Sequence, residues 1–310
     1  QVVSSRQALD SKASGIMFGL CILWGLQQVV LKLAVPDISA VMQIALRSGL
    51  SALMAYPMIK LAKGTSLWGR DYLPAGVLVG LLFAAEFFLV AQALRFTSAA
   101  HTVVLLYTAP IFVALGLHWK LPSERLSLIQ WLGIACAFFG IVIAFLFRPA
   151  ASQAAASSAL WGDALALLAG VLWAATTIAV RLTKLAEAPA TQTLFYQLFI
   201  AFLVLLTVAF FMGHATIHWS VLSLTSLLFH TVVVSFASYL IWFWLLKKYL
   251  ASQLGVFSFL TPIFGMCFGV VLLNEHLELN FLVGTCFVLM GVSLHHKIKQ
   301  YAQAFKVALQ

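Results

Sequence analysis

Three polar side chains lie inside long apolar segments of the sequence, and their types suit them to charge and proton chemistry. Glu86 is the only carboxylate well inside such a segment, while Arg47 and Gln28 lie in two others. Burial favours the neutral form of a carboxyl and a nearby cation favours its ionised form, so a neighbour that moves can switch its proton. Two interpretations stay open for Glu86: proton exchange during function, or a fixed tie to Arg47 or a glutamine that holds helices together.

Aromatic and hydroxyl side chains near the middle of other apolar segments form a second group of candidates. Large rings with a few polar groups among them are typical of cavities that bind small organic molecules. Packing between helices is the competing interpretation for each ring taken singly. Together with Glu86 and Gln28, the predicted substrate-binding residues are Trp24, Tyr107, Trp173, Thr177, Ser238, Tyr239 and Trp242.

Motifs for other kinds of chemistry are missing from the sequence. It contains no HExxH, no GxSxG, no Gly-Lys-Ser/Thr phosphate loop and no filter-like glycine run. Its four cysteines have neither paired nor metal-type spacing. We therefore expect no metal, no cofactor and no catalysis, and we keep an integral membrane enzyme or a channel as the alternative.

The composition indicates which solvent surrounds these segments. Hydrophobic residues make up 63% of the 310 residues and charged residues only 9%, and the mean hydropathy is +1.03. Because a soluble domain carries about a quarter charged residues, this chain must face lipid over much of its surface. The net charge of +9 does not predict a nucleic-acid partner, since the basic residues are spread singly along the chain.

Ten apolar segments are long enough to cross a bilayer, so we expect an all-α integral membrane protein. The Ala/Ser-rich stretch 150–159 is typical of a linker between two halves. The expected helices span residues 14–34, 39–61, 73–95, 100–118, 127–147, 160–182, 193–212, 223–246, 253–273 and 280–296.

The two halves repeat one another. The run LYTAPIF at 106–112 returns as SFLTPIF at 258–264, which places Pro110 and Pro262 inside apolar runs where each removes a helical hydrogen bond. We expect these prolines to be fixed kinks that shape a cavity. Further pairs at offsets of 149–152 residues are Trp24/Trp173, Lys32/Arg181, Gln43/Gln192, Glu124/Glu275, Gly133/Gly284 and Gly140/Gly291.

Five spans in each repeat is an odd number, so the second repeat must be inserted upside down relative to the first. Such inverted repeats are the architecture of many secondary transporters. The predicted organisation is a first repeat at 1–149, the linker at 150–159 and a second repeat with a cytoplasmic tail at 160–310.

The basic residues predict the orientation. If the N-terminus is cytoplasmic, 14 of the 18 lysines and arginines fall in cytoplasmic segments, as the positive-inside rule requires. The far side then holds Lys32, Arg95 and Arg148. We expect a multi-pass protein of the plasma (inner) membrane with both termini in the cytoplasm.

One ordered set of short motifs occurs in both halves and covers essentially the whole chain. It comprises Trp24-Gly25, Leu46-Arg47, the Leu94–Ala99 turn, Pro110 and the Glu124–Gly133 run, with second-half counterparts Trp173, Pro262, Glu275 and Gly284. In this set the sequence resembles the EamA family of the drug/metabolite transporter (DMT) superfamily. The resemblance implies a transporter of small organic metabolites, often an amino-acid exporter, with a central cavity between the repeats. The second half has Tyr196 in place of Arg47, so the cavity is not expected to be symmetric.

The combined prediction is a secondary transporter that works by alternating access around a midplane cavity. Its expected partners are a small-molecule substrate such as an amino acid, the lipid bilayer and, if Glu86 titrates, protons. The sequence does not distinguish a monomer from a homodimer.

Overall fold

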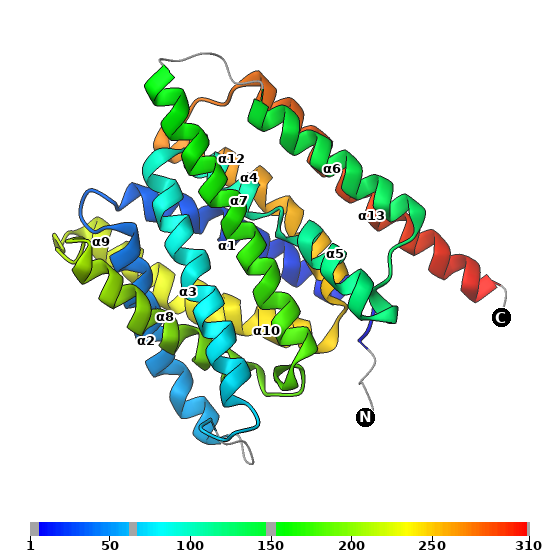
Figure 1. Ribbon diagram of the computed structural model, residues 1–310, viewed down its shortest axis with the longest axis horizontal. Coiled ribbons are helices and arrows are strands. Elements are labelled where there is room, and N and C mark those ends of the chain that lie inside the picture. The colour runs from blue at the N-terminus through cyan, green and yellow to red at the C-terminus, as the bar shows by residue number, and fades with distance from the viewer. Residues whose placement is uncertain (1–5, 62–66, 147–152, 309–310) are drawn as a thin grey trace.

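The computed structural model describes residues 6–61, 67–146 and 153–308, and within these ranges it contains helices and no β-strand (Figure 1). The helices of the first half are α1 (Ser11–Leu33), α2 (Ala40–Leu61), α3 (Leu73–Phe96), α4 (Ala99–Leu106), α5 (Ala109–Lys120), η1 (Pro122–Glu124) and α6 (Leu128–Leu146). Those of the second half are α7 (Gln153–Leu182), η2 (Lys184–Ala186), α8 (Ala190–Phe211), α9 (Val221–Leu228), η3 (Phe229–Ser238), α10 (Tyr239–Lys248), α11 (Ala251–Phe257), η4 (Ser258–Leu260), α12 (Thr261–Leu273) and α13 (Leu279–Ala308).

The described residues confirm an all-helical membrane protein. Seven helical segments are long and apolar enough to span a bilayer: Ser11–Leu33, Leu73–Phe96, Ala99–Lys120, Ser157–Leu182, Ala190–Phe211, Val221–Lys248 and Gln253–Leu273. Two shorter apolar helices, Leu128–Ile143 and Leu279–Gly291, occupy two more of the predicted spans. The remaining one, α2, buries Gln43, Arg47, Ser48 and Ser51, which makes it less apolar. The count of ten spans therefore stays a prediction.

The structure differs from the prediction at the linker and at the two prolines. Residues 150–152 of the expected linker lie outside the described residues, and α7 already begins at Gln153 because its alanines favour helix. The prolines interrupt the regular α-helix within the spans Ala99–Lys120 and Gln253–Leu273. Each stands in the first turn of a new helix, α5 or α12, after a break at residues 107–108 or a 3₁₀ turn at 258–260. Proline fits the first turn because that position needs no N–H donor.

The bundle has two ends, which we name by the helices that begin or terminate there. Helices α1 and α3 begin at the N-terminal face, and α5, α7 and α10 terminate there. The other end is the opposite face. On the N-terminal face, Asp10 caps α1 by accepting a hydrogen bond from the Ala13 amide and another from the Tyr249 hydroxyl, at 2.8 and 2.9 Å. These two donors hold the pKa of Asp10 below its ordinary value.

Repeat-related glycines bring α6 and α13 into close contact along one edge of the bundle (Figure 1). A Cβ added at Gly140 would meet the carbonyl oxygen of Gly284, and one added at Gly291 would meet that of Gly133. The sequence pairs Gly133 with Gly284 and Gly140 with Gly291, so the contacts cross between the repeats. This reciprocity is what a two-fold relation between the halves requires.

We expect Gly140→Ala to destabilise the protein by about 1–3 kcal/mol, because the added methyl group overpacks a backbone contact. Gly15→Ala is the matched control, since a Cβ at Gly15 meets nothing within 4 Å and alanine is the better helix former. Thermal unfolding in detergent measures both variants. Equal melting temperatures for the two would contradict the close α6–α13 contact.

Candidate functional site

A small cavity lies in the middle of the bundle and takes its lining from both halves of the chain. Its volume is about 40 Å³. The first half contributes α1, α3 and the end of α4, and the second half contributes α7, α8 and α10. The lining residues are Trp24, Gln27, Phe83, Glu86, Phe87, Leu106, Tyr107, Trp173, Thr176, Thr177, Gln197, Tyr239, Trp242 and Phe243.

Trp24 stands at the centre of the aromatic part of this cavity. Its ring centroid lies 5.4 Å from that of Trp242 and 6.0 Å from that of Trp173, with both pairs edge to face. Tyr107 lies 4.9 Å from Trp173 and completes the cluster. The two repeat-related tryptophans therefore meet at the interface between the halves, where four rings form one apolar wall.

A π-helical segment, η3, precedes the cavity residues of α10. At its end, the Ser238 hydroxyl accepts a hydrogen bond of 3.1 Å from the Trp24 indole nitrogen. Ser238 thus contacts the cavity through Trp24 and is not itself among the lining residues. Wide helical turns of this kind occur often at functional sites, because they redirect side chains without ending the helix.

Glu86 lines the cavity from α3 and is almost fully buried, with 3% of its surface exposed. Its Oε2 atom has no hydrogen-bond partner. Phe83 and Phe87, on either side of it in α3, pack with Tyr239. No ion pair within 4.0 Å joins Glu86 to Arg47 among the described residues. The direct Glu–Arg tie, one of the interpretations left open above, is therefore not formed in this conformation.

Arg47 lies behind the lining residues and holds two of them. Its guanidinium donates hydrogen bonds of 3.1 Å to Gln27 Oε1 and 3.1 Å to the Tyr239 hydroxyl. The same group lies 4.8 Å from the centre of the Phe87 ring, where the aromatic face attracts a cation. Arg47 is completely buried, so these contacts replace water around its charge.

The structure brings together most of the predicted binding residues. Trp24, Glu86, Tyr107, Trp173, Thr177, Tyr239 and Trp242 all line the cavity. Gln28 does not: it is buried with both side-chain polar atoms unpartnered, and its neighbour Gln27 lines the cavity instead. Sequence reasoning also missed Gln197, which could have been found as another amide inside an apolar segment. Pro110 and Pro262 lie at the helix breaks and outside the lining.

The volume of the cavity indicates the conformation. A buried water needs about 10–15 Å³ of such volume, so 40 Å³ holds only a few waters. Sites for small organic ligands have about 300–1,000 Å³. Helices must therefore move before a metabolite can enter, and the structure represents a closed form of the site.

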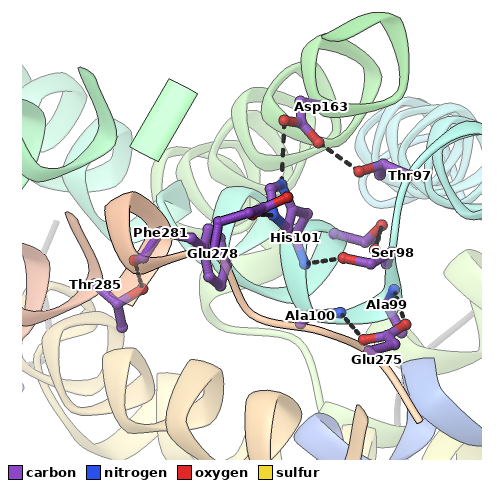
Figure 2. A network of polar contacts seen from close by, with 11 residues as sticks. Thr97, Ser98, Ala99, Ala100, His101, Asp163, Glu275, Glu278, Phe281 and Thr285 are labelled. Atoms are coloured by element: carbon purple, nitrogen blue, oxygen red, sulfur yellow. Dashed lines mark hydrogen bonds and ion pairs between the residues drawn. The ribbon is translucent and has the colours of Figure 1, made fainter. Parts of the chain in front are cut away.

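A second polar cluster lies on the opposite face (Figure 2). His101 has a carboxylate at each ring nitrogen, with Asp163 Oδ2 3.3 Å from Nδ1 and Glu278 Oε2 2.9 Å from Nε2. The Thr97 hydroxyl donates to Asp163 Oδ1 at 2.7 Å. Glu275 accepts hydrogen bonds from the first amides of α4. In the part of the chain that the structure describes, no group of three His, Cys, Asp or Glu side chains is arranged to hold a metal ion.

Comparisons with known proteins match nearly the whole chain. The profile of the EamA-like transporter family matches twice, at residues 12–146 and 160–295. The uncharacterized transporter YoaV of Bacillus subtilis is 23% identical, over 90% of this chain and 96% of the relative. A probable amino-acid metabolite efflux pump of Escherichia coli is 26% identical, over 96% of this chain and 99% of the relative. A solved crystal structure superposes with a TM-score of 0.69 at 17% identity over 93% of this chain and 98% of that one, which shows a shared fold.

Proposed function

The chain belongs to the EamA-like transporter family, and from this premise we propose that it is a secondary transporter that exports amino acids or similar small metabolites. The family match confirms the resemblance seen in the sequence, and a relative described as a probable amino-acid metabolite efflux pump supports the substrate class. We propose further that the protein lies in the plasma membrane with both termini in the cytoplasm. Moving a solute across the membrane needs no chemical conversion of that solute, so we do not propose an enzyme.

The observation that carries this proposal is the closed central cavity between the repeats. It combines an aromatic wall with one carboxyl and two amides, which are Glu86, Gln27 and Gln197. The rings suit the apolar part of a metabolite, and the carboxyl and amides suit its ammonium or other polar groups. Inverted repeats with a site at their interface are built to expose that site alternately to the two sides.

Counterflow in proteoliposomes tests the proposal. Purified protein is reconstituted with unlabelled amino acid inside, and uptake of the radiolabelled amino acid is followed across a panel. We expect saturable exchange for a subset of the panel, with a preference for apolar or aromatic side chains. Uptake that does not saturate would indicate a channel, and chemical conversion of the labelled compound would indicate an enzyme.

In the same assay we expect Trp24→Ala to weaken the apparent affinity by about tenfold or more. Trp24 stands at the centre of the aromatic wall, and a ring contact between Trp24 and a bound substrate would be worth about 0.5–1.5 kcal/mol, where about 1.4 kcal/mol corresponds to tenfold in affinity. Trp161→Ala is the matched control, since Trp161 is 58% exposed on the bundle surface. Equal affinities for the two variants would show that the substrate does not use the aromatic wall.

A further inference from the structure

Several ion pairs join the halves of the chain, and two of them, one at each face of the bundle, are related to each other by the sequence repeat. On the opposite face, Lys32 Nζ lies 4.0 Å from Glu275 Oε1. On the N-terminal face, an Arg181 guanidinium nitrogen lies 3.7 Å from Glu124 Oε1. In the sequence repeat Lys32 corresponds to Arg181 and Glu124 corresponds to Glu275. Each pair therefore takes its cation from one repeat and its carboxylate from the other.

The positions of the two cations are equivalent with respect to the cavity. Lys32 is in the last turn of α1, eight residues beyond Trp24, and Arg181 is in the last turn of α7, eight residues beyond Trp173. Eight residues of helix span about 12 Å. The two tryptophans meet in the cavity, so each ion pair lies about 12 Å from it, toward opposite faces.

We propose that these pairs are the two gates of the transport cycle, with Lys32–Glu275 closing the opposite face and Arg181–Glu124 closing the N-terminal face. This inference rests on the proposed transport function. Both pairs are formed in this structure, in agreement with the small closed cavity. Alternating access requires that one pair separates while the other stays formed, and pairs between repeats separate when the repeats rock apart.

The carboxylate of the gate on the opposite face has a second role in the closed form (Figure 2). Glu275 Oε1 and Oε2 accept hydrogen bonds of 2.8 and 3.2 Å from the amides of Ala99 and Ala100. A carboxylate at a helix N-terminus is stabilised by the unpaired amides and the helix dipole. Glu275 thus ties the start of α4, in the first repeat, to the segment between α12 and α13 in the second. Opening this gate must release Lys32 and α4 together.

The two gates differ in how far water reaches them. The side chains of Lys32 and Glu275 are 31% and 10% exposed, whereas those of Arg181 and Glu124 are 5% and 0% exposed. Partly exposed pairs are weak because water and salt screen them, while removing one partner of a buried pair has a large effect. The gate on the opposite face is therefore the easier one to open.

Sided labelling of one reporter cysteine tests both gates. Thr176→Cys places a thiol in the cavity lining, in a background where Cys21, Cys136, Cys267 and Cys286 are alanine. A membrane-impermeant maleimide is then added from either side. We expect Lys32→Met to raise the labelling rate from the opposite face about fivefold. We expect Arg181→Met to raise it from the N-terminal face about a hundredfold.

Lys184→Met is the matched control, because Lys184 forms a pair of 3.1 Å with Asp71 that is 67% and 75% exposed on the N-terminal face. It should change neither rate, and Lys32→Arg and Arg181→Lys should restore slow labelling. If Arg181→Met does not fold, chemical cross-linking of a Lys32→Cys, Glu275→Cys variant serves as a second measurement and should block counterflow.

The proposed gates would be rejected if the labelling rate rises equally from both faces, or if it rises in neither gate variant. They would also be rejected if the cross-linked protein still transports. The labelling does not depend on any transported substrate. Absence of counterflow with normal sided labelling would therefore reject the proposed function alone, and normal counterflow without sided labelling would reject the gates alone.

Discussion

Glu86→Gln is expected to abolish pH-driven accumulation of substrate, while substrate exchange continues at a higher apparent KM. Glutamine has nearly the same shape as glutamic acid and cannot release a proton, so the substitution separates the charge of residue 86 from its packing. Among the described residues that line the central cavity, Glu86 is the one carboxylate. If its proton moves with the substrate, a variant without that proton can still carry substrate in both directions but cannot use a pH gradient.

The size of the effect follows from the energy of the gradient. One pH unit corresponds to about 1.4 kcal/mol per proton, which supports about tenfold accumulation if one proton is exchanged per substrate. We expect the wild-type protein to reach this ratio in proteoliposomes with an imposed gradient of one pH unit, and Glu86→Gln to remain near equal concentrations. Counterflow at uniform pH measures exchange in the same preparations.

Asp71→Asn is the matched control for the loss of one carboxylate. Asp71 is 75% exposed on the N-terminal face and pairs there with Lys184, so its loss should change neither accumulation nor exchange. Accumulation by Glu86→Gln that still follows the pH gradient would assign Glu86 a structural role. The absence of an ion pair with Arg47 within 4.0 Å in the closed form already makes a purely structural tie between these two charges the weaker interpretation.

The parts of the site that could be predicted from the sequence are the residues that occur at equivalent positions in both repeats. Trp24 and Trp173 occupy equivalent positions in two inverted halves, so both had to approach the interface between them, and the structure places them 6.0 Å apart. Glu86 was predictable for a different reason. A carboxyl is too costly in an apolar helix to face lipid, so it must face the interior of the bundle.

The parts that did not follow depend on the rotation of each helix about its axis. Gln27 and Gln28 differ by 100° around α1, and an apolar helix with polar residues at both positions does not show which one faces the cavity. The form of the helix at the two prolines could not be predicted for a related reason. A proline within an apolar run is compatible with a kink or with the start of a new helix, and hydroxyls that bond nearby carbonyls favour the break. Thr108 and Ser258 donate to the carbonyls of Leu105 and Gly255.

The ion pairs show a further limit of sequence reasoning. The repeat alignment matches Lys32 with Arg181 and Glu124 with Glu275, but it does not show that matched residues exchange partners between the halves. That exchange depends on how the halves interlock, with α1 packed on α12 and α3 on α7. An internal repeat therefore predicts symmetry more readily than it predicts contacts.

Arg47 is the second residue at which we expect a large effect, and its role differs from that of Glu86. Arg47→Met should reduce transport by about tenfold to a hundredfold, because it removes the 3.1 Å donor from Gln27 Oε1 and from the Tyr239 hydroxyl and leaves Gln27 Oε1 with only a 3.5 Å contact from Tyr239. Each buried acceptor that loses its partner costs about 1–3 kcal/mol. Both acceptors line the cavity, so the loss should appear first in the apparent affinity for substrate.

Arg47→Lys separates the charge from the geometry of the guanidinium. Lysine keeps the positive charge but cannot present two donors in a fixed fork to Gln27 and Tyr239. If Arg47 positions these lining residues, Arg47→Lys should raise the apparent KM several-fold, with a smaller change in the maximal rate. If Arg47 acted only as a charge near Glu86, lysine would restore both constants.

The surface residue Arg95 provides the control for loss of a cation. Arg95 is exposed and donates a hydrogen bond of 2.9 Å to Gln92 within its own helix, so Arg95→Met should leave transport unchanged. Thermal unfolding distinguishes positioning from stability, since a misfolded Arg47 variant would lose cooperative unfolding together with transport. A folded Arg47→Met protein with normal affinity would contradict the positioning role, because the other described hydrogen bond to the Gln27 side chain is a longer one of 3.5 Å from the Tyr239 hydroxyl.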